Sequence, residues 1–241
     1  MNNYNTTLLT KNLERWNVIL TEIQIQQFIT YYELLLEWNS FINLTAITEY
    51  NEVIIKHFID SISLVNACDL SKNVKVIDVG TGAGFPGIPL KIVFPNLQIT
   101  LLDSLNKRVK FLNEVIQKLG LANIDTIHGR AEDIAKMELY REKYDICVSR
   151  AVANLSTLSE YCLPFVRING CFVSYKSEKI TEEMKTAKRA IELLGGKING
   201  QKEFILPESD INRNLFIINK VKATPKKFPR KAGLPVKEPI V

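Results

Sequence analysis

Residues that commonly bind metals are scarce in this sequence, which has two histidines and four cysteines among 241 residues. No two cysteines have the C-x-x-C spacing, so a zinc site would need ligands from distant parts of the chain. Cys147 and Cys171 lie within apolar, strand-like runs, where a small thiol packs well. We therefore expect no metal site and four reduced, structural cysteines.

Long apolar runs are absent as well. No stretch of eighteen apolar residues occurs, and the first eleven residues lack a basic segment followed by an apolar block. The sequence therefore supports neither a membrane span nor a signal peptide. With 46% hydrophobic residues the chain can bury a sizeable core of its own. We expect a cytoplasmic protein that is a monomer and does not bind a membrane.

Positive charge is concentrated at the C-terminus. Residues 220–241 have a net charge of +6, whereas the 219 residues before them have a net charge of −1. The same segment holds four of the nine prolines, so we expect it to be extended rather than helical. Such an arm suits a polyanion, and its binding would depend strongly on salt. The alternative is a solvated basic terminus without a partner.

A glycine-rich loop follows the most apolar strand-like segment, and together residues 74–87 read V-K-V-I-D-V-G-T-G-A-G-F-P-G. Glycine permits positive φ and leaves backbone N–H groups free to face a ligand. A side chain at Gly80, Gly82 or Gly84 would obstruct that approach. The D-x-G-x-G-x-G spacing resembles the first motif of class I S-adenosylmethionine (SAM) methyltransferases.

Two other interpretations of the loop remain open. Gly82, Gly84 and Gly87 also satisfy the dinucleotide pattern G-x-G-x-x-G, and the loop could be a tight turn without a ligand. Asp103 ends the next expected strand, nineteen residues beyond Gly84. A carboxylate there would overlook the loop and could accept both hydroxyls of an adenosine ribose. Alternatively, Asp103 is an acidic residue at a helix N-terminus.

Strands and helices alternate from residue 74 onward, which predicts a parallel sheet with helical crossovers. The expected strands are 74–79, 98–102, 124–128, 144–149, 171–175, 196–204 and 215–221, and the expected helices are 8–17, 22–40, 51–67, 86–93, 106–119, 155–166 and 181–194. We expect an α/β fold with a seven-stranded, mostly parallel sheet. Its parts are an N-terminal helical extension (1–70), a Rossmann-like core (71–221) and a basic, proline-rich arm (222–241).

Ligands of such sheets bind beyond the carboxyl ends of the strands. Three cations follow predicted strands there, namely Arg130, Arg150 and Lys176. They are candidate phosphate clamps, or else ordinary surface cations. Ala131 and Glu132 could border an adenine, or simply begin a helix with an acidic first turn.

The absence of two motifs narrows the choice of the atom that accepts the methyl group. The segment after the fourth strand reads S-R-A-V, not the Asn/Asp-Pro-Pro-aromatic turn associated with methylation of exocyclic nitrogens. No cysteine stands where a nucleophile for carbon-5 methylation would be needed. A ring nitrogen such as guanine N7 is a better acceptor, because its free lone pair needs only in-line positioning and no general base.

Several motifs in order resemble the ribosomal RNA small-subunit methyltransferase G family, also called glucose-inhibited division protein B. They are W-N-S-F-I-N-L-T-A-I at 38–47, K-H-F-I-D-S-I at 56–62, D-V-G-T-G-A-G-F-P-G-I-P-L at 78–90, G-R-A-E at 129–132, S-R-A-V-A at 149–153 and F-P-R-K-A-G-L-P-V-K-E-P-I at 228–240. The resemblance implies a class I SAM-dependent methyltransferase that methylates N7 of one guanine in 16S rRNA. It also implies the 30S subunit as substrate, with the guanine in the loop near the decoding site.

The same resemblance implies roles for individual residues. Gly80, Phe85, Ala131, Glu132 and Arg150 match the family's cofactor-binding positions, and Asp103 occupies the ribose position of the wider class. With Gly82 and Gly84 of the glycine loop, they make up the expected cofactor-binding set. Arg130, Arg150 and Lys176 match positions expected to be needed for activity, with Lys176 and the arm facing RNA. His57 either packs between helices or contacts substrate. Two further hypotheses stay open, an NAD-binding oxidoreductase and a non-catalytic rRNA-binding assembly factor.

Overall fold

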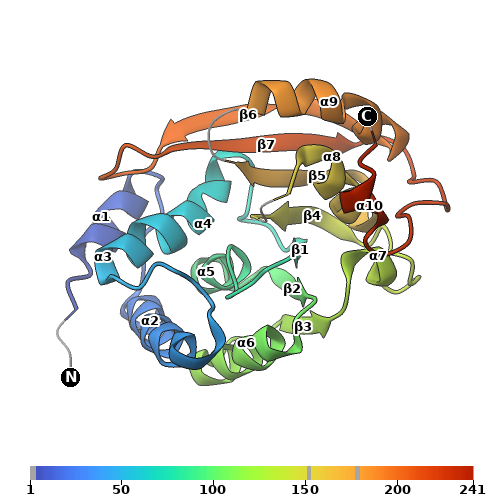
Figure 1. The fold of residues 1–241 in the computed structure, drawn as a ribbon. Helices are drawn as coiled ribbons and strands as arrows, with labels where there is room; N and C mark the ends of the chain where they lie inside the picture. Colours follow the sequence, from blue (N-terminus) through green and yellow to red (C-terminus); the bar gives the residue numbers. More distant parts are fainter. Residues whose placement is uncertain (1–3, 151–152, 177–179, 241) are drawn as a thin grey trace.

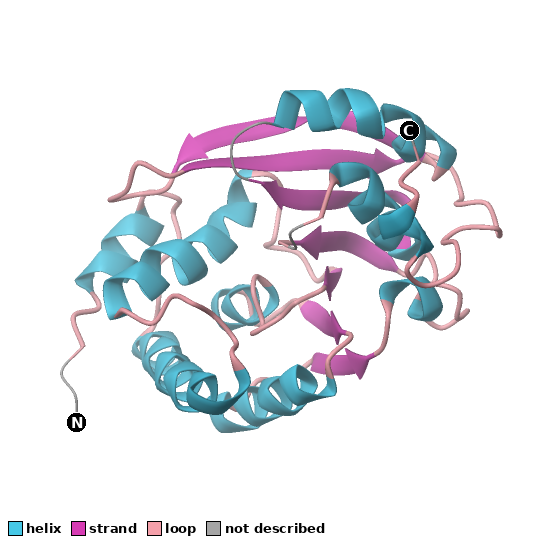
Figure 2. Ribbon diagram, viewed as in Figure 1, coloured by secondary structure: helices cyan, strands magenta, loops and turns pink. Residues whose placement is uncertain are grey.

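A computed structural model describes residues 4–150, 153–176 and 180–240 and contains one seven-stranded sheet with helices on both faces (Figures 1 and 2). The strand order is β3-β2-β1-β4-β5-β7-β6. β7 runs antiparallel to both of its neighbours, and the other pairs are parallel. The predicted α/β fold is therefore confirmed, including the number of strands.

All seven predicted strands are present, two with the predicted bounds (124–128 and 144–149) and the others with shifted ends. They are β1 (Lys75–Val79), β2 (Gln98–Asp103), β3 (Ile124–His128), β4 (Tyr144–Ser149), β5 (Val166–Lys176), β6 (Gly196–Ile205) and β7 (Asn212–Lys220). The central strands are apolar on both faces, as expected for a parallel sheet covered on both sides. In β1, Val76 packs into the core on one face and Ile77 into the core on the other.

The helices form two layers (Figure 1). One layer holds α1 (Thr7–Glu14), α2 (Glu22–Ile42), α3 (Tyr50–Val53), α4 (Asp60–Ile62), α5 (Gly87–Val93) and α6 (Asn106–Leu119). The other holds α7 (Ala131–Ile134), α8 (Leu155–Cys162), α9 (Ile180–Leu193) and α10 (Leu234–Lys237). In the described part of the chain, no helix combines the length and apolarity that crossing a bilayer would require.

The N-terminal helices share a core with the sheet. The side chain of Thr21 and that of Gln24 form a capping box that starts α2. Gln24 also donates a hydrogen bond of 2.8 Å to the carbonyl of Ile92, near the end of α5. Phe28 and Leu35 of α2 are buried in the same apolar cluster as the inner strands. The extension is therefore packed against the core rather than tethered to it.

The prediction of a single helix over residues 51–67 is wrong in detail. The segment remains helical, but a π-helical turn, η1 (Ile54–Ile59), separates α3 from α4, and a 3-10 turn, η2 (Ser63–Asn66), ends it. A π turn is wider than an α turn and often occurs at functional sites. Here it includes Lys56 and His57, both of which contact Arg150.

The helix expected over residues 155–166 is too long. α8 ends at Cys162, and residues 163–165 form a 3-10 turn, η3 (Leu163–Phe165). Pro164 lies in that turn and lacks the N–H that an α-helix would need. β5 consequently begins at Val166, five residues before the expected start.

The C-terminal arm is not wholly extended. α10 forms one helical turn, with Pro235 in the first turn of the helix, where a missing N–H costs nothing. Phe228 and Pro235 are buried, and α10 packs on α8 (Figure 1). The expectation of an arm too rich in proline for any helix is therefore wrong.

One of the basic residues counted with that arm is internal. Lys220 is 1% exposed, and its Nζ lies 2.9 Å from Glu142 Oε1. The same ammonium group donates to the carbonyls of Leu163 and Val166 and to the hydroxyl of Thr224. Lys220 thus joins β7 to the turn before β5 and to the start of the arm.

Replacing Lys220 by Met should lower the free energy of unfolding by about 3 kcal/mol, because Glu142 and two buried carbonyls lose their donor. Urea unfolding followed by circular dichroism measures the change. The matched control is Lys222→Met, two residues away and exposed, which should change stability by less than about 0.5 kcal/mol. Equal effects of the two variants would contradict the structural role of Lys220.

Candidate functional site

The carboxyl ends of the parallel strands meet at one edge of the sheet, where a cavity of about 260 Å³ opens. Five residues predicted for cofactor binding or activity line it, namely Gly80, Asp103, Arg130, Ala131 and Glu132. They come from the loop after β1, the end of β2 and the segment after β3. The parallel sheet therefore brings together three chain segments that are far apart in the sequence.

Asp103 is fixed at the floor of this cavity. It is 2% exposed, and its Oδ1 accepts a 2.8 Å hydrogen bond from the N–H of Leu105. Its Oδ2 accepts one of 2.9 Å from the N–H of Gly82 and lies 3.4 Å from Nη1 of Arg108. Oδ1 keeps a lone pair for a further donor, and Oδ2 can take one by giving up its long contact with Arg108. The acidic group is thus held rigidly and remains able to accept hydroxyl groups of a ligand.

The backbone N–H groups of the glycine loop do not have the role that the sequence predicts. The N–H groups of Gly80 and Thr81 both donate to the carbonyl of Leu102, which lies in β2 next to the loop. Together with the bond from Gly82 to Asp103, these contacts tie the loop to β2. The expectation that these donors are free to face a ligand is therefore wrong.

Two glycines of the loop are required for different reasons. Gly82 has φ of +62°, and a Cβ there would meet nothing within 4 Å, so its missing side chain leaves space open to a ligand. Gly84 has φ of +97°, and a Cβ there would lie 2.5 Å from Ile88 and 2.8 Å from the hydroxyl of Tyr31. Gly84 is thus needed for packing against α2 and α5.

Asp78 lies near the end of β1, beneath the loop, and is fully buried. Its Oδ2 accepts hydrogen bonds from the hydroxyl of Thr81 (2.6 Å) and the N–H of Gly87 (2.9 Å). Oδ1 has no hydrogen-bond partner within the described residues. Burial raises the pKa of Asp78 from 3.8 to about 6, although both hydrogen bonds act in the opposite direction.

Phe85 points away from the cavity, toward the N-terminal extension. Its ring stacks on His57 with 4.5 Å between ring centroids, and the guanidinium of Arg150 lies 5.0 Å from its centroid. His57 is 8% exposed. Burial first, and then the charge of Arg150, lowers the pKa of His57 to about 3, so the imidazole is neutral at physiological pH. Of the two roles left open for His57, packing is the one that these contacts support.

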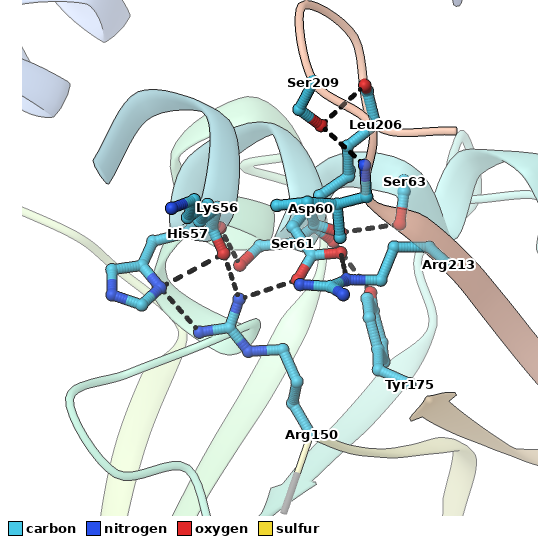
Figure 3. A network of polar contacts seen from close by, with 11 residues as sticks. Lys56, His57, Asp60, Ser61, Ser63, Arg150, Tyr175, Leu206, Ser209 and Arg213 are labelled. Carbon is cyan, nitrogen blue, oxygen red and sulfur yellow. Dashed lines mark hydrogen bonds and ion pairs between the residues drawn. The ribbon is translucent and has the colours of Figure 1, made fainter. Parts of the chain in front are cut away.

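Arg150 does not point into the cavity either (Figure 3). Its guanidinium donates to the carbonyl of Lys56 and to Asp60 Oδ2, each at 3.0 Å, and lies 3.1 Å from Nδ1 of His57. Nδ1 also lies 3.2 Å from the carbonyl of Lys56, and Nε2 lies 2.9 Å from Thr45 Oγ1. Arg150 therefore joins the end of β4 to the π turn.

Asp60 completes this network (Figure 3). It is 1% exposed, and its second oxygen, Oδ1, accepts a 2.9 Å hydrogen bond from Arg213 at the start of β7. The hydroxyl of Tyr175 in β5 donates to the carbonyl of Ser61 at 2.7 Å. The end of β4, the start of β7 and the end of β5 thus all bind the same helical segment.

The two remaining predicted cations differ from each other. Lys176 is 12% exposed at its side chain, and its Nζ binds Glu183 of α9 at 2.9 Å and the carbonyl of Ala153. It is held inside rather than presented to solvent. Arg130 lines the cavity at the start of α7 and is the predicted cation best placed to meet a bound ligand.

Sequence reasoning missed several residues of the cavity. Leu158 and Tyr161 reach it from α8, and Ser104 and Ser149 from strand ends. The two serines could have been predicted as cavity residues from the rule that ligands bind at strand ends. The contribution of α8 could not be seen, because the expected helix had no assigned face. No cluster of His, Cys, Asp and Glu suited to a metal ion occurs within the described ranges.

Comparison with known proteins gives consistent matches. A family model described as "GidB: rRNA small subunit methyltransferase G" matches residues 24–212. Ribosomal RNA small subunit methyltransferase G of Lachnoclostridium phytofermentans is 53% identical over 98% of each chain, and the protein of that name from Thermoanaerobacter sp. is 50% identical over 100% of each. A solved SAM-dependent methyltransferase from Aquifex aeolicus has a TM-score of 0.51 at 18% identity, covering 70% of this chain and 93% of its own, a likeness of fold alone.

The pKa of Asp78 predicts how stability varies with pH. The pKa of Asp78 is about 6 in the folded state, so as pH rises the carboxyl ionises at lower pH in the unfolded chain than in the folded protein. The free energy of unfolding therefore falls between pH 4 and 6. Asp78→Asn removes this titration. The stability of the variant relative to wild type should therefore rise by about 2 kcal/mol from pH 4 to pH 7, as measured by urea unfolding at several pH values. A difference independent of pH would contradict the buried, unpaired carboxyl.

Proposed function

The chain belongs to the rRNA small subunit methyltransferase G family, and from this premise we propose that it transfers a methyl group from SAM to N7 of one guanine in 16S rRNA. The substrate is the 30S subunit, with the target in the loop near the decoding site. The observation that carries the proposal is the cavity at the strand ends, in which Asp103, Gly80 and Arg130 meet. Family membership removes the oxidoreductase hypothesis.

The residues of the cavity fit the nucleoside part of SAM. The carboxylate of Asp103 accepts the ribose hydroxyls, one at the open lone pair of Oδ1 and one at Oδ2 in place of the 3.4 Å contact with Arg108. Leu158 and the ring of Tyr161 supply an apolar wall for the adenine. Gly82 leaves the approach from the loop open. When bound, SAM supplies a sulfonium methyl group as the electrophile.

N7 methylation suits the chemistry of the side chains at this edge of the sheet. Guanine N7 has a lone pair and no proton to lose, so the protein need only hold the base in line with the methyl group. The carboxyl of Asp78 lies fully buried under the loop, out of reach of a substrate. His57 is neutral and held by Thr45 and Arg150. Neither group is needed as a base in this reaction.

Arginine and lysine side chains near the opening contact the phosphates of the RNA. Arg130 is the cation at the cavity itself. Three lysines of the C-terminal arm, Lys226, Lys231 and Lys237, have exposed side chains. Phosphate contacts from such side chains position RNA without reading its sequence. The choice of one guanine then depends on the shape of the substrate around it.

The decisive experiment measures transfer of labelled methyl from SAM to 30S subunits from a strain that lacks this protein. Mass mapping of the RNA should locate one 7-methylguanine in 16S rRNA. Subunits from the wild-type strain serve as the control and should accept no label, because the site is already methylated. SAM binding and 30S binding without transfer would instead support a non-catalytic assembly factor.

Asp103→Ala should weaken SAM binding by about 30-fold, which corresponds to about 2 kcal/mol for the loss of hydrogen bonds to a charged acceptor. Calorimetric titration with SAM measures the dissociation constant, and thermal unfolding reports whether the variant is folded. Asp133→Ala, at an exposed carboxylate in α7, is the control and should bind SAM like wild type. An unchanged affinity in a folded Asp103→Ala protein would remove Asp103 from the cofactor site.

The arm should contribute to RNA affinity through salt-dependent interactions. Replacing Lys226, Lys231 and Lys237 together by Met should reduce the slope of log Kd for 30S subunits against log salt by about one for each phosphate that the arm no longer binds. SAM affinity should not change. A slope equal to that of wild type would mean that these lysines are solvated and bind no phosphate.

A further inference from the structure

The C-terminal segment, residues 228–240, lies against α8 (Figure 1), and α8 also lines the cavity. Two side chains of α8 hold its backbone. The hydroxyl of Thr157 donates to the carbonyl of Pro235 at 2.9 Å, and that of Ser156 donates to the carbonyl of Ile240 at 2.6 Å. Residues 224–228, which lead into the segment, are held by Arg141, whose guanidinium donates to three of their carbonyls.

A buried ion pair fixes the middle of the segment. Glu160 of α8 is 1% exposed, and Arg230 binds it through both Nε and Nη2, the latter at 2.7 Å from Oε2. The backbone N–H of Arg230 donates to Oε1 of the same carboxylate at 2.7 Å. A bidentate pair of this kind fixes orientation as well as distance. Arg230 therefore belongs to the fold, although the sequence places it among cations expected to face RNA.

A second carboxylate connects the segment to the cavity. Oε1 of Glu132 accepts a 2.8 Å hydrogen bond from the N–H of Gly233, and Glu132 also lines the cavity. Gly233 has φ of +85°, a conformation that brings this N–H to the carboxylate at little cost only without a side chain. Glu132 is 4% exposed, so its carboxylate faces the segment on one side and the cavity on the other.

α8 is a second connection between the C-terminal segment and the cavity. Ser156, Thr157 and Glu160 contact the C-terminal segment, whereas Leu158 and Tyr161 of the same helix line the cavity. At 100° per residue these two sets occupy adjacent faces of one helix. Tyr161 and Glu132 line the same cavity, and the pKa of Tyr161 is raised to about 12, first by burial and then by the charge of Glu132.

We propose that the C-terminal segment sets the shape of the SAM cavity, with Arg230 and Gly233 as positioning residues that act through Glu160 and Glu132. The proposal rests on the proposed function, in that the cavity is taken to hold SAM. It predicts that a defect in this segment weakens cofactor binding, an effect that a solvated or purely RNA-binding arm would not have. Docking of RNA on the exposed lysines of the segment would then act directly on the wall of the cofactor site.

The test compares two adjacent cations of the segment. Arg230→Met removes the buried pair, and Lys231→Met removes an exposed charge of the same sign. We expect Arg230→Met to raise the Kd for SAM by about tenfold or more, measured by calorimetry well below the melting temperature. Lys231→Met should leave that Kd within about twofold of wild type. At saturating SAM, Lys231→Met should raise the KM for 30S subunits, because it removes an exposed cation, whereas Arg230→Met should leave that KM near the wild-type value, because Arg230 is already paired with Glu160.

Arg230→Lys provides a second variant that keeps the charge and loses the bidentate geometry. Its Kd for SAM should lie between those of wild type and Arg230→Met, and it tests the proposal if Arg230→Met does not fold. Wild-type SAM affinity in a folded Arg230→Met or Arg230→Lys protein would overturn the proposal. Failure of the wild-type protein to bind SAM would instead overturn the proposed function, so the two failures are distinguishable.

Discussion

The buried carboxylate of Asp60 is the interaction on which the arrangement of the site depends. It is 1% exposed and carries one arginine on each oxygen, Arg150 from the end of β4 and Arg213 from the start of β7. An ionised carboxylate in such a place is tolerated only when it is paired and hydrogen-bonded, and losing one partner typically costs about 3–5 kcal/mol. The helical extension is thus held to the ends of two strands of the sheet.

The network around Asp60 is connected to the glycine loop through aromatic packing. Arg150 lies over the ring of Phe85, the same ring stacks on His57, and the hydroxyl of Tyr31 in α2 donates to the carbonyl of Ala83. The glycine loop is therefore held from two directions, by the N-terminal helices on one side and by Leu102 and Asp103 of β2 on the other. A loop fixed in this way is pre-organised, so less conformational freedom is lost when a ligand binds.

Periodicity and the topology of parallel sheets are enough to predict much of this arrangement from the sequence. All seven strands, the long helices and the gathering of Asp103, Arg130 and Glu132 at one edge can be derived from these rules. The direction in which a side chain points cannot be derived from these rules. Arg150 stands at a strand end like Arg130 does, yet it turns toward Asp60, a residue ninety positions away. Pairing between distant residues depends on how the π turn and the N-terminal helices pack, and local patterns do not encode that.

Burial also changes how the positive charge of the C-terminus should be interpreted. Net charge suggests a uniform cationic arm, but Lys220 and Arg230 are each held by a carboxylate of the core, Glu142 and Glu160. A cation neutralised in this way releases no counterions when RNA binds, so it adds little to salt-dependent affinity. In the proposed function the exposed lysines bind phosphate, while the paired cations hold the segment in place. Cations that look alike in the sequence therefore have two roles, holding the segment in place and facing solvent, and burial decides which residue has which role.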